Sequence, residues 1–191
     1  NLGIEVKFNT EIKDIEKLDA DEIIIATGSK ARKLNFKGSE NIIDAIDYLE
    51  NQEKVGENVL IIGGGLTGCE IAYELSLKGK KVSIIEAKND LMAVSGLCLA
   101  NSSYLRDYFK HNKTPVYLES FVQDIVDGKA TIVGKDGSLN TIKVDTVISA
   151  IGYEPDPLTK ESKHVHVVGD ALKVGNLRTV VWKAWEVAES I

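Results

Sequence analysis

One short segment limits the folds open to this chain more than any other. Residues Val59 to Ile62 form an uncharged apolar run, and Gly63, Gly65 and Gly68 follow it at once in a G-x-G-x-x-G spacing. A buried strand that turns sharply through glycines into a helix is typical of a βαβ unit in a parallel sheet. We therefore expect an α/β fold with a Rossmann-like parallel sheet, whose first helix ends at Gly79.

The same glycines indicate a ligand class. Gly63 permits the tight turn, Gly65 lets the backbone approach a pyrophosphate, and Gly68 lets the helix pack on the sheet. The free N–H groups at the helix N-terminus favour phosphate. The run from Lys81 predicts a second strand that ends at Glu86, near the place of the acid that accepts hydrogen bonds from ribose hydroxyls. A carboxylate there would repel a 2′-phosphate, so the pattern predicts binding of NADH rather than NADPH.

Composition excludes several other classes. A net charge of −6 and no basic stripe argue against a nucleic-acid binder. No apolar run is long enough to span a bilayer, and no signal-type segment opens the chain. Cys69 and Cys98 form no C-x-x-C pair, which favours a reducing, cytoplasmic location. Cys69 is interpreted as a small packing residue in preference to a thiol activated by the helix dipole.

The rest of the chain alternates between further strands and helices. Three short runs separated by Asp-Gly pairs predict an antiparallel meander. His164 and His166 alternate along a strand but lack a third ligand, so no metal site is expected. The other strands are expected at Glu5–Asn9, Glu22–Ala26, Thr146–Ala150 and Val165–Val168, the meander at Phe121–Val126, Ala130–Val133 and Asn140–Val144, and helices at Ile42–Asn51, Ala100–His111 and from about Asn176 or Leu177.

An eight-residue pattern, D-x-x-I-x-A-x-G, occurs twice. It runs from Asp21 to Gly28 and again from Asp145 to Gly152. Each copy predicts an apolar strand that leaves its sheet through small residues and a glycine turn. Chance similarity of short apolar segments is the alternative, and the matching turn residues favour a true repeat.

Four motifs, in this order, carry a family resemblance. They are Ala26-Thr27-Gly28, Gly63-Gly64-Gly65-x-x-Gly68-x-Glu70, Ala150-Ile151-Gly152 and Val168-Gly169-Asp170. The order resembles that of flavoprotein reductases with two dinucleotide-binding domains, which have the pyridine nucleotide-disulfide oxidoreductase fold. More narrowly, the chain is similar to the 2-enoate reductase and 2,4-dienoyl-CoA reductase group of NADH:flavin oxidoreductases.

The resemblance implies a nicotinamide domain inserted into a flavin-binding domain. Residues 56–143 would be the NAD-binding domain, residues 1–36 and 144–191 remnants of the flavin domain, and residues 37–55 a linker with a helix. The family's flavin domain normally opens with its own G-x-G-x-x-G unit, and this chain has one such motif in all. FAD contacts are therefore expected to be incomplete in this chain alone.

The resemblance also implies roles for single residues. Glu70 would lie close to the nicotinamide, although a solvated acid favoured by the helix dipole is the alternative. Asp170 would accept a hydrogen bond from the flavin ribityl chain, or else serve only as a turn residue. The residues expected at NADH are Gly63, Gly64, Gly65, Leu66, Thr67, Gly68, Glu70, Glu86, Ala150 and Gly152. Those expected at FAD are Ala26, Thr27, Gly28, Gly169 and Asp170.

The implied function is the NADH-binding, electron-input module of a flavin-dependent enoate reductase. An FMN-binding barrel and an iron–sulfur cluster would belong to missing amino-terminal domains, and the chain alone would hold NADH without completing turnover. No catalytic residue is expected within it. Two alternatives stay open: another branch of the superfamily, such as a ferredoxin or disulfide reductase, and a non-catalytic nucleotide-sensing module. Trp182 and Trp185 predict an apolar face on the last helix, and hence association with a missing domain or a second copy.

Overall fold

The computed structural model describes residues 2–51, 54–94 and 96–191, and divides the chain into two compact units. One unit is continuous and contains residues 31–152. The other is built from both ends of the chain, residues 1–30 and 153–191. The predicted NAD-binding domain, residues 56–143, falls inside the continuous unit.

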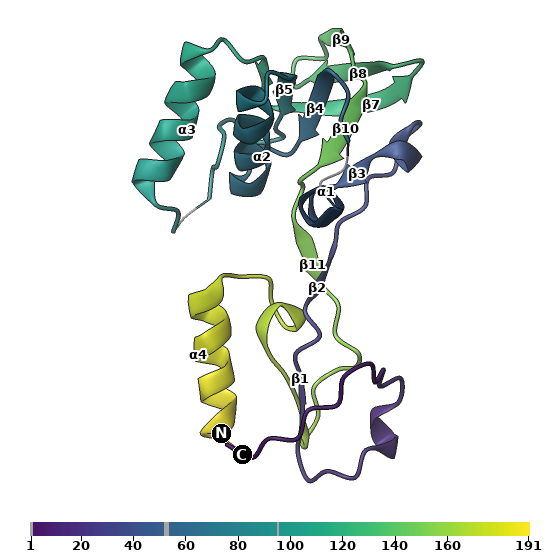
Figure 1. Ribbon diagram of the computed structural model, residues 1–191, viewed down its shortest axis with the longest axis vertical. Helices are drawn as coiled ribbons and strands as arrows, with labels where there is room; N and C mark the ends of the chain where they lie inside the picture. The colour runs from purple at the N-terminus through teal and green to yellow at the C-terminus, as the bar shows by residue number, and fades with distance from the viewer. Residues whose placement is uncertain (1, 52–53, 95) are drawn as a thin grey trace. The chain divides into compact units, whose positions relative to one another are not determined.

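A five-stranded sheet forms the centre of the continuous unit (Figure 1). Its order is β3-β10-β4-β5-β6, and every neighbouring pair is parallel, so the predicted α/β fold with a parallel sheet is confirmed. The strands are β3 (Ile43–Asp44), β4 (Asn58–Ile62), β5 (Lys81–Ile85), β6 (Val116–Tyr117) and β10 (Thr146–Ser149). Strand β4 is buried along most of its length, as expected of a parallel strand covered on both faces.

Helices cover one face of this sheet and the meander covers the other (Figure 1). The helices are α1 (Ala45–Asn51), α2 (Leu66–Leu77) and α3 (Leu99–His111). Leu75 of α2 and Phe109 of α3 are fully buried against Ile61 and Ile84 of the sheet. Helix α2 ends as predicted, since Gly79 has a φ of 78° and donates its N–H to the carbonyl of Ser76.

The antiparallel meander is confirmed. It consists of β7 (Ser120–Val126), β8 (Lys129–Gly134) and β9 (Leu139–Lys143), in that order. Asp127 and Gly128 both have positive φ, which is the two-residue hairpin geometry that an Asp-Gly pair favours. Ala130 and Ile132 of β8 are buried against the central sheet.

The second unit has a smaller framework. Strands β1 (Ile23–Ile25) and β12 (Val165–Val167) form a parallel pair, and β11 (Tyr153–Pro155) pairs with β2 (Ser29–Ala31), whose last residue is the first of the continuous unit. Among the described residues, short 3₁₀ turns occur in this unit at η1 (Ile15–Lys17) and η3 (Gly169–Ala171), and in the continuous unit at η2 (Ser39–Asn41). Helix α4 (Leu177–Ala188) contacts η3, and its start agrees with the prediction.

The two copies of the repeat adopt similar local structures. Each begins with a strand, β1 or β10, and each ends at a glycine of positive φ, 84° at Gly28 and 89° at Gly152. Strands β2 and β11 follow these glycines and pair with each other. The predicted strand and glycine turn are thus present in both copies.

The prediction of a strand at Glu5–Asn9 is wrong. This segment contains no strand, and its apolar side chains Val6 and Phe8 are exposed. An extended segment forms a strand only when a neighbour pairs with its backbone, and none of the described strands lies beside it.

The helix expected at Ile42–Asn51 begins three residues late. Ile43 and Asp44 form β3 and pair with β10, and the helix starts at Ala45. Ile42 packs on the meander side and Ile43 on the helix side, which is the alternation of a strand. The part of the expected linker at residues 52–53 lies outside the described residues.

Candidate nucleotide site

The glycine turn joins the carboxyl end of β4 to α2. Gly63 has a φ of 110° and donates its N–H to the carbonyl of Ile85, 2.8 Å away. A side chain at Gly63 would overlap the backbone of Ala150, and one at Gly68 would overlap the carbonyl of Gly63. Two of the glycines therefore let β4, β10 and α2 approach one another closely.

Gly65 has a different environment. A side chain at this position would meet nothing within 4 Å, and its φ of −69° suits any residue. As the N-cap of α2 it supplies no side-chain acceptor to the first N–H groups of the helix, which include those of Leu66 and Thr67. The turn thus presents open space and helix N–H groups together, which is the arrangement that binds a pyrophosphate.

Glu86 lies beside this turn. Its Oε2 accepts the N–H of Gly64 at 2.7 Å, and its Oε1 accepts the N–H of Lys88 at 2.8 Å. An ionised carboxylate has about four acceptor positions, so each oxygen keeps capacity for a hydroxyl donor. The residue predicted to contact the ribose is therefore fixed by the backbone at the carboxyl end of β5.

Cys69 is a packing residue. It is fully buried, and burial raises the pKa of its thiol to about 12. Its Sγ lies 3.5 Å from the carbonyl oxygen of Gly64 and donates to it. A thiol with this pKa is not ionised at neutral pH, so the interpretation as a packing residue holds.

The other residues predicted at NADH lie around the same strand ends. Ala150 donates its N–H to Ile62 at 2.7 Å, which places it next to the glycine turn. Gly152 is two residues further along and exposed, and Glu70 is an exposed side chain in the second turn of α2. The structure thus brings Gly63, Gly64, Gly68, Glu86 and Ala150 into one cluster, with Glu70 and Gly152 at its exposed margin.

The residues predicted at FAD form a second cluster, in the other unit. Ala26, Thr27 and Gly28 follow β1, while Gly169 follows β12. The N–H of Val168 donates to the carbonyl of Ile25 at 2.9 Å, so the two strand ends are neighbours. Thr27 also donates its hydroxyl to the carbonyl of Asp156 at 3.1 Å.

Asp170 holds the turn that leads into α4. Its Oδ1 accepts the N–H of Gly175 at 3.1 Å. Helix α4 begins with a reciprocal cap in which Asn176 and Thr179 satisfy each other's backbone N–H groups. Asp170 therefore acts as a turn residue in this structure, and one of its carboxylate oxygens is not used in that contact.

The two strand histidines share one carboxylate. His164 and His166 each lie 2.9 Å from an oxygen of Glu22, and the hydrogen bond from His164 is the main cause that lowers the pKa of Glu22. Over the part of the chain that the structure describes, no group of three or more potential ligands could hold a metal ion. Among the same residues, no helix is both long and apolar enough to cross a bilayer.

Sequence reasoning missed a segment that contacts the glycine turn. Residues 88–94 follow β5, and within them the N–H of Met92 donates to the carbonyl of Gly64 at 2.6 Å. Arg106 of α3 holds the same segment through Asp90 and Leu91. Leu91 and Met92 open an apolar run that continues through Ala93 and Val94, and this run was the sequence signal of burial, although Val94 is exposed.

Comparison with known proteins identifies relatives along the whole chain. The model of a family described as pyridine nucleotide-disulphide oxidoreductase matches residues 2–179. Cinnamate reductase of Clostridium sporogenes is 38% identical over 199 aligned positions, which cover all of this chain and 30% of that protein. NADH oxidase of Thermoanaerobacter brockii is 30% identical over 99% of this chain and 31% of that protein. The chain thus spans about a third of the length of these relatives.

Solved structures with the same fold include a 2-naphthoyl-CoA reductase complex. It matches with a TM-score of 0.82 and 24% identity, over 99% of this chain and 30% of that one. At this identity the likeness shows the fold alone. Family membership implies FAD and a nicotinamide nucleotide as the cofactors.

Proposed function

Because the chain belongs to the pyridine nucleotide-disulphide oxidoreductase family, we propose that it is the NADH-binding, electron-input module of a larger flavin-dependent oxidoreductase. The observation that carries the proposal is Glu86, fixed at 2.7 Å from the N–H of Gly64 beside an open glycine turn. A carboxylate at this place offers acceptors to the 2′- and 3′-hydroxyls of an adenosine ribose and repels a 2′-phosphate.

The substrate class follows from the relatives. The parent protein would reduce activated C=C bonds of enoates or enoyl-CoA-type compounds. In support, the relative at 38% identity over the full chain is named as a cinnamate reductase, and cinnamate is an enoate. The whole protein's reaction would need segments beyond this chain, since the chain spans 30% of that relative.

The residues around the glycine turn fit a dinucleotide. The open space at Gly65 and the first N–H groups of α2 would take the pyrophosphate, while Glu86 would take the ribose. Glu70 and Gly152, at the exposed margin, would orient the nicotinamide end. When bound, the nicotinamide supplies a hydride and the flavin accepts it, and the protein provides binding and orientation.

The flavin end is proposed on a narrower basis. Ala26, Thr27, Gly28, Gly169 and Asp170 would contact FAD from the ends of β1 and β12. Since the chain has one G-x-G-x-x-G motif, the remaining FAD contacts would come from elsewhere in the parent protein. An FMN site and an iron–sulfur cluster would likewise belong to other segments of a cytoplasmic parent.

Nucleotide titration tests the proposal. Calorimetry should show that the wild-type chain binds NADH more tightly than NADPH. Glu86→Ala should weaken NADH binding about tenfold or more, because a hydrogen bond to a charged group contributes about 1.5–3 kcal/mol. The same variant should lose the preference for NADH over NADPH. Glu50→Ala, which removes an exposed carboxylate from α1, is the matched control and should bind as the wild type does.

Two results would contradict the proposal. One is an absence of binding by either nucleotide to a folded wild-type chain. The other is an unchanged NADH preference in Glu86→Ala. NADH binding without flavin reduction by the full-length protein would favour a nucleotide-sensing module instead.

A further inference from the structure

Residues 88–94, here called the strap, cross the glycine turn and are tied to it by one short hydrogen bond. The N–H of Met92 donates to the carbonyl of Gly64 at 2.6 Å. Met92 has a φ of 52°, a backbone conformation that residues other than glycine rarely adopt. Only 3% of its surface is exposed. Leu91 is also buried, and its side chain fills the space where a Cβ of Gly64 would be. The surrounding packing must therefore hold the strap in this conformation.

The hydrogen bond from Met92 sets the direction of one peptide group. A trans peptide points its C=O and its N–H to opposite sides. The carbonyl of Gly64 points toward Met92 and also accepts from the thiol of Cys69. The N–H of Gly65 in the same peptide must then point away from the strap. We take this N–H as one of the donors to a pyrophosphate at the turn.

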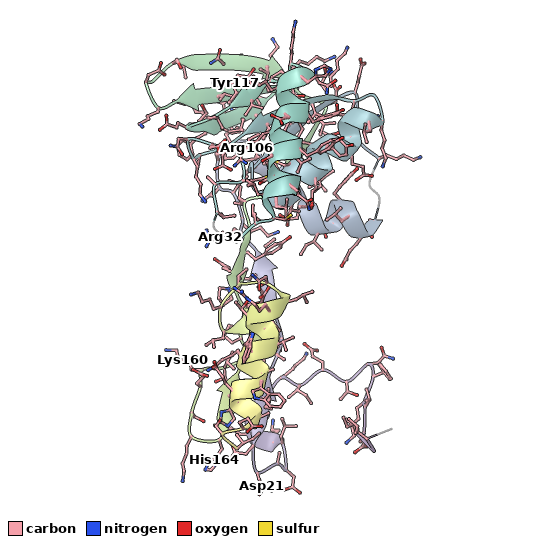
Figure 2. All side chains as sticks on the ribbon, turned by 90° about the vertical axis from the view of Figure 1, so that its left-hand side faces the viewer. Asp21, Arg32, Arg106, Tyr117, Lys160 and His164 are labelled. Carbon is pink, nitrogen blue, oxygen red and sulfur yellow. The ribbon has the colours of Figure 1, made fainter. Side chains whose placement is uncertain are left out.

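Arg106 lies on α3 (Figure 2), and its side chain holds the strap from there. Its Nη2 donates to the carbonyl of Leu91 at 2.5 Å, its Nε donates to Oδ1 of Asp90 at 3.2 Å, and Nη2 lies 3.1 Å from the other oxygen of Asp90. A guanidinium that engages both carboxylate oxygens fixes geometry as well as charge. Lys88 adds a hydrogen bond within the strap, because its Nζ donates to the carbonyl of Ala93 at 3.1 Å.

These contacts form one chain from α3 to the nucleotide turn. We propose that Arg106 is a positioning residue for the dinucleotide site: it fixes the strap, the strap fixes the Gly64 carbonyl, and the Gly65 N–H is thereby aimed at the pyrophosphate. The inference rests on the proposed function, since it assumes that the turn binds NADH. In this role Arg106 would act through the strap and not by contact with the nucleotide.

A purely structural role for Arg106 makes a different prediction. If the ion pair only stabilised α3, its loss would lower the stability of the unit and leave nucleotide affinity unchanged in the folded protein. If it aims the Gly65 N–H, its loss must weaken binding under conditions where the chain stays folded. The exchange of one amide proton, that of Met92, separates the two roles directly.

The experiment combines hydrogen exchange with NADH titration on the full chain. In Arg106→Leu, the amide of Met92 should exchange at least about tenfold faster, while the amide of Leu60 in β4 keeps its protection. NADH affinity should fall about tenfold, because binding must then order a released segment. Arg106→Lys keeps a cation that can reach Leu91 or Asp90, and should restore most of the affinity. Lys110→Leu removes an exposed cation from the same helix and should change neither readout.

The outcomes separate this inference from the proposed function. A wild-type chain that does not bind NADH overturns the proposed function, and this role of Arg106 with it. A wild-type chain that binds NADH, alongside Arg106→Leu that binds equally well, overturns the role of Arg106 alone. So does an unchanged exchange rate at Met92.

Discussion

At the scale of single residues, the glycines of the turn have separable roles. Gly68 lets α2 lie against the backbone of Gly63, and a side chain there would overlap a carbonyl oxygen that cannot move aside. Gly65 has an ordinary φ and open space on its Cβ side. The fold therefore needs a glycine at position 68, whereas a glycine at position 65 would be needed only by a ligand.

Alanine at each position should separate stability from binding. Gly68→Ala should lower the free energy of unfolding by about 1–3 kcal/mol or more, as overpacking does. Gly65→Ala should leave it within about 1 kcal/mol of the wild type, because alanine accepts this φ. The same substitution should abolish most NADH binding, since a methyl group would fill the space expected for the pyrophosphate. Urea unfolding with NADH titration measures both, and equal stability losses in the two variants would contradict the assignment.

Some of these residues could be predicted from the sequence and others could not. Glu86 and the glycines follow a spacing that local geometry imposes on any strand–turn–helix unit, so their cluster was predictable. The contact of Arg106 with Asp90 joins a helix to an irregular segment sixteen positions earlier in the chain, and no periodic pattern encodes it. Met92 was equally hidden, because its left-handed backbone depends on packing that only the folded unit provides.

At the scale of elements, the side chain of the residue just before β10, Asp145, holds the start of this strand. Asp145 accepts the backbone N–H of Asn58 at 2.8 Å and the side-chain amide of the same residue at 2.7 Å. The hydrogen bond from the backbone of Asn58 is the main cause that lowers the pKa of Asp145. This carboxylate thus aligns β10 with β4, the two strands whose carboxyl ends form the candidate nucleotide site.

The contribution of Asp145 should depend on pH in one direction. A carboxyl whose pKa is lower in the folded protein stabilises the fold above its unfolded value of about 3.9. That stabilisation is lost as pH falls through the lower, folded pKa. Asp145→Asn should therefore be less stable than the wild type at pH 7, and the difference should shrink in acid below about pH 3.9. A difference in urea midpoint that grows on acidification would be inconsistent with this linkage.

The elements that the sequence predicted correctly are those with local signals. Strand β4, helix α2 and the meander have apolar periodicity bounded by glycine turns. Residues 5–9 have the same apolar alternation and form no strand, because pairing requires a neighbour that the pattern cannot supply. The two residues of β3 were read as helix, since a strand this short leaves almost no period to detect.

At the scale of the whole molecule, one helix keeps a large apolar face uncovered. In helix α4, Trp182 and Trp185 are each 62% exposed. Leu177 and Val181, nearer the start of the helix, lie on the same face and are also exposed. The predicted apolar face is present. Large exposed apolar patches on proteins usually mark contact with another surface.

Association through this face should be measurable. Sedimentation should show a mass that rises with concentration, and Trp182→Gln combined with Trp185→Gln should lower it toward the monomer. Since these are the only tryptophans in the chain, acrylamide quenching of the wild type should also fall as association increases. A wild-type chain that stays monomeric, with fully accessible tryptophans at all concentrations, would disprove self-association.

The nesting of one unit within the other also dictates an order of events during folding. All of the continuous unit lies in one uninterrupted stretch, residues 31–152. It can therefore fold before residues 153–191 have been synthesised. The parallel pair β1–β12 must instead join segments separated by more than a hundred residues. Closing a flexible loop of that size costs several kilocalories of chain entropy, whereas a folded insert holds its two exits at a fixed separation. We therefore expect β1 to pair with β12 only after the continuous unit has folded. Refolding of the unit built from residues 1–30 and 153–191 should then be the later and slower kinetic phase.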